Sequence, residues 1–171
     1  MPLNKLKKYN DLLELAYLSE SQRTASLKGI FIRDIADNKG FSFQGKNIYP
    51  TPRENGEIEM QNLFNHLTRK KEHNDRENHR VFDMSRSQRL HWIRFHIEEQ
   101  KKDDMLVFSV DEPEGIRTYI YDIAEQYVIV LEPSRAHDSY YLLTAYHLEG
   151  RDAKRNKIIA KYRKRRLPKV Y

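Results

Sequence analysis

The side chains best suited to chemistry gather on two segments that read as β-strands. The run 140–147 alternates as a strand does, which would place Tyr140, Thr144 and Tyr146 on one face. An earlier strand-like run would place Arg117 on a face with two further tyrosines. An arginine, several phenols and a threonine hydroxyl on one sheet surface could bind phosphate and stack nucleobases. Tyrosine and threonine are also ordinary strand residues, so the same pattern fits a sheet with no ligand.

A segment with helical periodicity, residues 85–100, precedes these strands and carries two histidines. Its apolar side chains recur on one face, so we expect that face to pack on the sheet, with His91 and His96 at or beside the contact. Arg89 lies on the same segment. An imidazole titrates near neutral pH, so either histidine could transfer a proton, although a histidine on a helix is commonly structural or solvated.

Positive charge is concentrated at the end of the chain. From Arg151 onward there are ten lysines and arginines against one acid, so this segment has a net charge of +9, while the first 150 residues have a net charge of −3. A cluster of this kind beside the strand 140–147 favours a phosphate-rich partner such as nucleic acid. The alternative is a solvated helix with a basic tail.

The elements that must position these residues are predicted from periodicity and turn signals. Apolar residues at helical spacing predict a helix over residues 6–17, with Ser19 to Ser21 as its stop signal. The stretch 41–49 predicts a small hairpin, and residues 60–67 a short helix. The four closing strands are expected at Met105–Val110, Arg117–Ile123, Tyr127–Leu131 and Tyr140–Leu148, with a last helix over residues 152–166.

Short connections between the four strands favour an antiparallel meander. We therefore predict an α+β fold, with helices packed on a four-stranded antiparallel sheet and a smaller N-terminal helical or irregular region. The predicted organisation is an N-terminal region (residues 1–68), a polar linker (residues 69–80) and an α+β domain that ends in a basic helix (residues 81–171).

Composition restricts the compartment and the chemistry. The chain has 171 residues and no cysteine, which excludes disulfides and thiolate metal sites and fits a reducing compartment. We expect a soluble cytoplasmic protein without a membrane span, because no apolar run is long enough. His73 and His79 flank Asn74, Asp75 and Asn78, but the spacing matches no metal motif and favours a solvated linker. No metal and no cofactor are therefore predicted.

Several short motifs are similar to those of a known class of proteins. They are Arg80-Val81-Phe82-Asp83, Arg89-Leu90-His91-Trp92-Ile93 and Tyr140-Tyr141-Leu142-Leu143-Thr144-Ala145-Tyr146, followed by the basic final segment. With these motifs, residues 79–166 resemble the phage-encoded nuclease-like domains of the barnase–EndoU–colicin–RelE class. The upstream stretches 43–52 and 63–68 look like leader segments of similar prophage proteins.

The resemblance implies helices on a four-stranded antiparallel sheet and, in active members, RNA cleavage without metal. Such cleavage needs a base for the 2′-OH proton, an acid for the departing 5′-oxygen, and donors for the charge on phosphate. We expect His91 (or His96) to be the acid or base, with Arg117, Thr144 and Tyr146 completing the catalytic set. The substrate-binding residues expected beside them are Arg89, Tyr140, Lys154, Arg155 and Lys161.

Two alternatives keep this fold without the chemistry. The first is a nucleic-acid-binding or phage accessory protein whose basic tail contacts phosphates. The second is an interaction module whose first 65 residues contact a partner, such as an immunity or antitoxin protein or another phage protein. RNA is the expected partner under the leading hypothesis, and its products would be a 2′,3′-cyclic phosphate and a 5′-OH.

Overall fold

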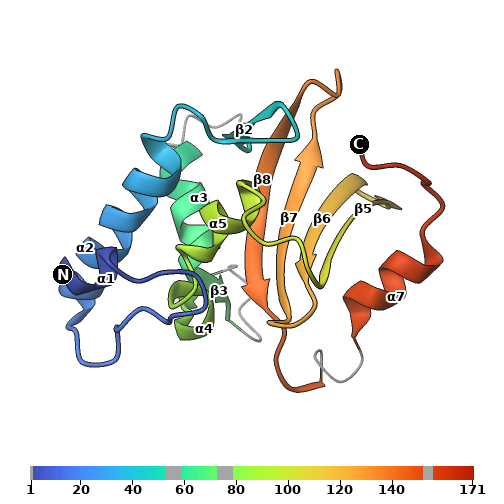
Figure 1. Ribbon diagram of the computed structural model, residues 1–171. Coiled ribbons are helices and arrows are strands. Elements are labelled where there is room, and N and C mark those ends of the chain that lie inside the picture. The colour runs from blue at the N-terminus through green and yellow to red at the C-terminus, as the bar shows by residue number, and fades with distance from the viewer. Residues whose placement is uncertain (1, 53–58, 73–78, 152–155) are drawn as a thin grey trace.

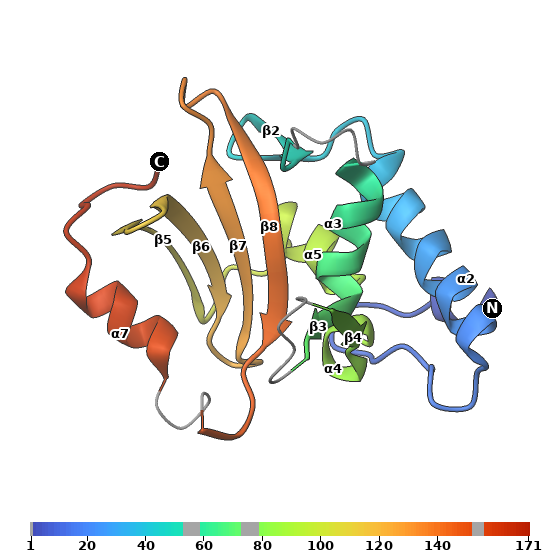
Figure 2. The same ribbon diagram turned by 180° about the vertical axis from the view of Figure 1, so that it is seen from behind.

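One curled β-sheet forms the centre of the molecule in the computed structural model, which describes residues 2–52, 59–72, 79–151 and 156–171 (Figure 1). Helices cover one face of the sheet, and α7 (Lys157–Lys164) packs on the other (Figures 1 and 2). The predicted α+β class is therefore confirmed. The six strands lie in the order β1 (Ser42–Phe43), β2 (Lys46–Pro50), β8 (Ser139–His147), β7 (Tyr127–Pro133), β6 (Gly115–Asp122) and β5 (Met105–Glu112).

The predicted four-stranded antiparallel sheet is wrong, because the sheet has six strands and is mixed. The four expected strands do form an antiparallel meander, β5 to β8. The N-terminal hairpin extends it, since β2 runs parallel to β8 with Ile48 opposite Tyr140. A strand's own periodicity shows which of its faces is buried but does not identify its neighbours. The alternation of residues along each strand therefore did not predict that β2 pairs with β8.

The hairpin predicted over residues 41–49 is confirmed as β1–β2. Its two turn residues, Gln44 and Gly45, have positive φ angles of 49° and 80°. Positive φ at both central positions belongs to the type I′ turn, whose twist matches that of the strands it joins. The turn thus fixes the register in which Ile48 faces the core, where it is 7% exposed.

The helix predicted over residues 6–17 is not observed. After α1 (Pro2–Lys5) the chain is irregular up to Leu18, although Leu13 and Leu15 are fully buried. Ser19, expected to stop a helix, instead caps the start of α2 (Glu20–Phe31). Its hydroxyl accepts from the Gln22 N–H at 3.3 Å, and the Gln22 side chain accepts from the Ser19 N–H at 3.0 Å. This capping box defines a beginning rather than an end.

The helix predicted over residues 85–100 is divided into α4 (Met84–Ser87) and α5 (Trp92–Ile97). In a continuous helix the Gln88 carbonyl would accept from the Trp92 N–H. Here it accepts from the Leu13 N–H at 3.0 Å, and the Trp92 N–H bonds three residues back, to Arg89. The irregular N-terminal segment therefore replaces a helical hydrogen bond and breaks the helix.

The helix predicted over residues 60–67 is confirmed as α3 (Glu59–Thr68), which buries Leu63, Phe64 and Leu67. A five-residue π-helical turn, η1 (Ile32–Ala36), continues α2. Within the described residues, no helix combines the length and the apolar character needed to cross a membrane.

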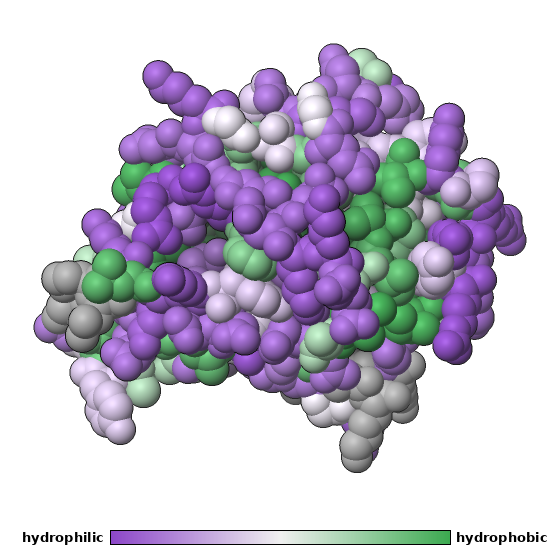
Figure 3. Space-filling model, viewed as in Figure 1, coloured by the Kyte–Doolittle hydropathy of each residue, from purple (hydrophilic) through white to green (hydrophobic). Residues whose placement is uncertain are grey.

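Two hydrophobic cores lie on the two faces of the sheet. The larger joins α2, α3, α4 and α5 to the sheet around Trp92, which is 2% exposed. Truncating a buried side chain of this size costs about 3–5 kcal/mol. The smaller core packs Ile158 of α7 against Phe108 and Tyr119. In Figure 3 its margin shows as an apolar area beside α7 on an otherwise mostly hydrophilic face.

Both parts of the predicted organisation contribute to one sheet and to the larger core. β1 and β2 come from the predicted N-terminal region, and β5 to β8 from the predicted α+β domain. The ends of the predicted linker form a two-stranded hairpin of β3 (Arg69–Lys71) and β4 (Arg80–Phe82). Residues 73–78, which include His73, lie outside the described part of the chain.

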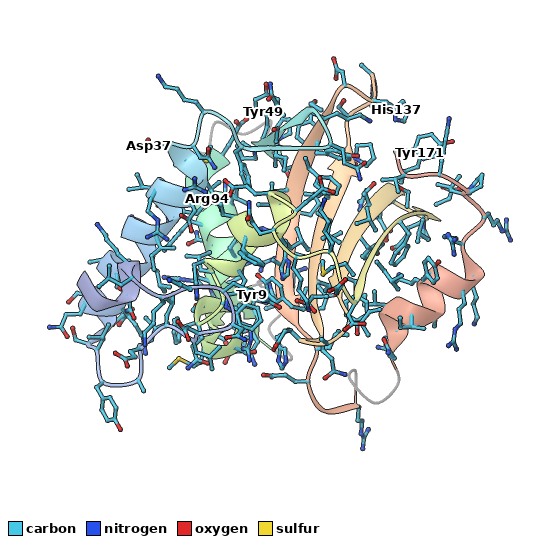
Figure 4. All side chains as sticks on the ribbon, viewed as in Figure 1. Tyr9, Asp37, Tyr49, Arg94, His137 and Tyr171 are labelled. Atoms are coloured by element: carbon cyan, nitrogen blue, oxygen red, sulfur yellow. The ribbon has the colours of Figure 1, made fainter. Side chains whose placement is uncertain are left out.

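The basic C-terminal segment is fastened to the sheet at two places. Ile158 and Tyr162 of α7 pack on the smaller core. Beyond the helix, the Tyr171 N–H donates to Ser109 at 2.9 Å, and its main-chain oxygen accepts from Thr118 at 3.1 Å (Figure 4). α7 is shorter than the predicted helix over residues 152–166, of which residues 152–155 lie outside the described part.

Candidate functional site

A cleft of about 910 Å³ lies beside the second half of β8. β2 pairs with β8 only as far as Leu142, and among the described strands none continues this pairing beyond it. α3, α4 and the β3–β4 hairpin stand next to that edge (Figure 2). We call this the β8-edge cleft. Its basic side chains are Lys70, Lys71, Arg80, Arg86 and Arg117.

The β8-edge cleft is electropositive. Among its described lining residues, the five lysines and arginines face two carboxylates, Glu59 and Glu132, which leaves a formal charge of +3 with His66 neutral. Cations from four different elements that converge on one concavity focus a positive potential there. The arrangement suits an anion with several charges, such as a phosphodiester chain.

A β-bulge in β8 places Thr144 in this cleft. Val130 of β7 is opposite Thr144, but the next residue of β7, Leu131, is opposite Leu142, so Leu143 has no partner in this register. An extra residue moves all later side chains to the other face. The expectation that Tyr140, Thr144 and Tyr146 share one face is therefore wrong. Tyr140 packs in the larger core, whereas Tyr146 packs against the smaller one.

Arg86 joins the elements around the cleft. Its Nη1 lies 3.2 Å from Thr144 Oγ1 and also donates to the carbonyls of His66 (3.0 Å) and Arg69 (3.2 Å). Its Nε lies 3.3 Å from the carboxylate of Asp83, whose other oxygen caps α4 by accepting from the Arg86 N–H. The guanidinium is thereby held in one orientation, with the Thr144 hydroxyl beside it.

Arg117, which we predicted to bind phosphate, reaches the cleft from β6. Its Nη1 lies 3.2 Å from the Glu132 carboxylate, and both side chains are partly exposed. The ion pair places a carboxylate and a guanidinium at the sheet side of the cleft. An anion bound here would compete with Glu132 for Arg117.

His66, which is not among the predicted site residues, brings an imidazole to the cleft. It lies on α3, partly exposed, and its carbonyl accepts from Arg86. Glu59, Asn62 and His66 recur at spacings of three and four, so they form one stripe along α3 beside the buried leucines. That stripe was readable in the sequence as the polar margin of an amphipathic helix.

His91, the histidine expected to act in catalysis, lies elsewhere. It is 6% exposed, and its Nε2 donates to the Lys8 carbonyl at 2.9 Å. Burial lowers the pKa of His91. It lines a separate hollow of about 200 Å³ with Tyr9 and Arg94, so the structure does not bring it together with Thr144.

Arg89 is also turned away from the cleft. Its Nη1 donates to Ser85 (2.8 Å to the carbonyl oxygen and 3.0 Å to Oγ), and its guanidinium lies 5.3 Å from the ring centre of Trp92. Burial lowers the pKa of Arg89. These contacts are those of a residue that holds α4 to α5.

His96 belongs to a buried polar cluster around Asp122. The Asp122 carboxylate is 0% exposed and accepts from Lys101 at 2.6 Å and from the Tyr9 hydroxyl, and His96 Nε2 lies 3.2 Å away (Figure 4 labels Tyr9). Burial alone would raise the pKa of Asp122, but these three partners outweigh burial and hold the pKa well below its usual range. The cluster ties the N-terminal segment to β6.

The other expected binding residues are dispersed. The Tyr140 hydroxyl donates to the main-chain oxygen of Tyr171, and Lys161 forms an ion pair with Glu112. Tyr146 lies near the cleft, with the Arg86 guanidinium 5.6 Å from its ring centre. Lys154 and Arg155 lie outside the described residues.

Comparison with known proteins finds no protein-family model, curated protein or solved structure that matches this chain. Over the part of the chain that the structure describes, no three histidine or acidic side chains gather as a metal site would require. The chemical groups that line the cleft are lysine and arginine cations, the His66 imidazole, two carboxylates and the Thr144 hydroxyl.

Proposed function

We propose that the β8-edge cleft binds single-stranded RNA and cleaves it through attack of the 2′-OH, without a metal ion. The observation that carries the proposal is that Arg86, Thr144 and His66 line one cleft, in which Arg86 contacts the Thr144 hydroxyl and the main-chain carbonyl of His66. Lys70, Lys71 and Arg80 extend the positive charge along the cleft. The resemblance to phage-encoded nuclease-like domains points to the same chemistry.

The reaction divides into proton transfers and charge stabilisation. The 2′-oxygen forms a bond to phosphorus while the bond to the 5′-oxygen breaks, which yields a 2′,3′-cyclic phosphate and a 5′-OH. His66 and one carboxylate, Glu59 or Glu132, would act as the acid–base pair. One of the two would take the proton of the 2′-OH, and the other would give a proton to the departing 5′-oxygen. Arg86 and the Thr144 hydroxyl would donate to the non-bridging oxygens as negative charge grows. DNA, which lacks the nucleophile, would bind without being cleaved.

A second candidate, RNA binding without cleavage, is favoured by one observation. Two arginines of the cleft already hold protein partners, since Arg117 pairs with Glu132 and Arg86 with Asp83. Structural ion pairs of this kind are compatible with a cleft that only binds a phosphate chain.

Incubation of the purified protein with end-labelled RNA, with and without EDTA, tests the proposal. We expect cleavage that EDTA does not inhibit, with cyclic phosphate ends and no cleavage of DNA of the same sequence. RNA binding without cleavage would support the second candidate. Cleavage abolished by EDTA would contradict the metal-independent mechanism.

Replacing Lys70 and Lys71 with glutamine is expected to weaken RNA binding and to flatten its salt dependence. Each phosphate that a lysine no longer neutralises lowers the slope of log affinity against log salt by about 0.7 for single strands. The control is the double variant Lys39→Gln, Lys102→Gln, which removes two exposed lysines outside the cleft. Equal slopes for the two double variants would show that RNA does not follow the cleft.

A further inference from the structure

A second, smaller hollow of about 220 Å³ adjoins the β8-edge cleft at the β3–β4 hairpin. α2, α3 and both strands of the hairpin line it. Arg80 lines both hollows, so they share a wall. An RNA strand bound in the β8-edge cleft and extended past Arg80 would therefore enter the smaller hollow.

The smaller hollow contains an arginine whose guanidinium lies over an aromatic ring. The guanidinium carbon of Arg23, on α2, lies 3.9 Å from the centre of the Phe82 ring on β4. This is a stacking distance, and Arg23 remains partly exposed. A guanidinium plane supported from one side by a ring is a platform on which a nucleobase can stack from the other.

Cations continue along the hairpin from this platform to the cleft. In the antiparallel register Arg69 is opposite Phe82, and Lys71 is opposite Arg80. Because positions two apart on a strand share a face, these four side chains lie on one face of the ribbon. Arg69 lines the smaller hollow, Lys71 lines the cleft, and Arg80 lines both. The hairpin thus presents cations to both hollows, as a bound strand that passes from one to the other would require.

We propose that the smaller hollow is a second nucleotide subsite, in which a base stacks on Arg23 while Arg69 and Arg80 contact its phosphate. The subsite rests on the proposed function of the cleft, since it positions the same RNA strand one step further along. Its ligand is therefore a single-stranded RNA long enough to pass Arg80.

The lining also indicates which bases fit best. Glu20, at the start of α2, lines the hollow with Arg23. A carboxylate accepts hydrogen bonds from exocyclic amino groups, as on cytosine, adenine and guanine. Uracil has no such group, so we expect the subsite to disfavour it.

The experiment compares kcat/KM for a dinucleotide, which fills only the cleft, with that for a longer oligonucleotide that reaches the hollow. We expect Arg23→Ala to lower kcat/KM about tenfold on the longer RNA, the scale of one base stack, and to leave the dinucleotide unchanged. Arg23→Lys should show a similar loss, because it keeps the charge but removes the plane. The matched control is Lys28→Ala, which removes an exposed charge from the same helix outside the hollow.

The outcomes separate the subsite from the function of the cleft. Full activity of Arg23→Lys on the longer RNA would mean that only charge matters and would overturn the stacking subsite. Equal effects of Arg23→Ala on both substrates would overturn it as well, while dinucleotide cleavage would still support the proposed function. A wild-type protein that cleaves neither substrate would refute the function and the subsite together.

Discussion

Replacing His66 with glutamine is expected to lower the rate of RNA cleavage by about 10²-fold or more, the usual contribution of a general acid or base. His66 lies on α3 in the cleft that holds Arg86 and Thr144. Glutamine keeps hydrogen-bonding capacity and much of the volume but cannot exchange a proton near neutral pH. Because the side chain is only partly buried, the fold should survive. Single-turnover cleavage of labelled RNA, with binding measured separately, distinguishes lost chemistry from lost affinity.

The matched control is His137→Asn. His137 is exposed in the β7–β8 loop and outside the cleft lining, and its φ of 57° suits asparagine, which adopts this conformation more readily than most residues. It should cleave RNA at the wild-type rate. If His66→Gln also does, His66 carries no proton in the reaction. If His66→Gln is impaired and His137→Asn is not, Glu59→Gln and Glu132→Gln identify which carboxylate carries the other proton.

Replacing Asp122 with asparagine is expected to lower the free energy of unfolding by about 3 kcal/mol or more, the scale for removing one partner of a buried ion pair. The carboxylate is inaccessible to solvent, and Lys101, Tyr9 and the Glu125 N–H all donate to it. The substitution leaves Lys101 without its counter-ion. Urea denaturation of both proteins measures the difference.

Two further variants serve as comparisons for the stability loss expected of Asp122→Asn. Tyr9→Phe removes a single hydrogen bond to a charged carboxylate and should cost about 1.5–3 kcal/mol. Asp103→Asn makes the same chemical change at an exposed position nearby and should stay within about 0.5 kcal/mol. Equal stability of Asp122→Asn and Asp103→Asn would show that the buried cluster does not hold the N-terminal segment to β6.

The Asp122 contribution should also depend on pH in a defined direction. Its pKa is lowered in the folded protein, so the carboxylate stabilises the fold above its unfolded pKa of about 3.9. That stability is lost as pH falls from there toward the lowered folded value. The difference between the wild type and Asp122→Asn should therefore be constant near neutral pH and shrink below about pH 4. A difference unchanged under acid conditions would contradict the ionised state of Asp122.

The candidate site was only partly predictable, and β8 shows why. Alternation correctly identified the strand and the presence of Thr144 on it, but the bulge at Leu143 reverses the faces beyond it. A bulge depends on how a strand meets its neighbour, so a single strand's pattern does not reveal it. Arg117 was singled out from the alternation of β6, a strand without a bulge, and the structure places it in the cleft. His66 was missed because α3 was assigned to a separate N-terminal region.

Elements whose signals are local followed from the amino-acid sequence. Turn chemistry and alternation were sufficient for β5 to β8 and for the β1–β2 hairpin, and amphipathic spacing was sufficient for α3. Only the tertiary structure shows which of these elements contact one another. Three features depend on residues far apart in the chain: the pairing of β2 with β8, the bond from Leu13 to Gln88 that breaks the helix between α4 and α5, and the placement of His66 and Thr144 in one cleft. Contacts of this kind are fixed by burial and hydrogen bonding between distant segments, which no local pattern encodes.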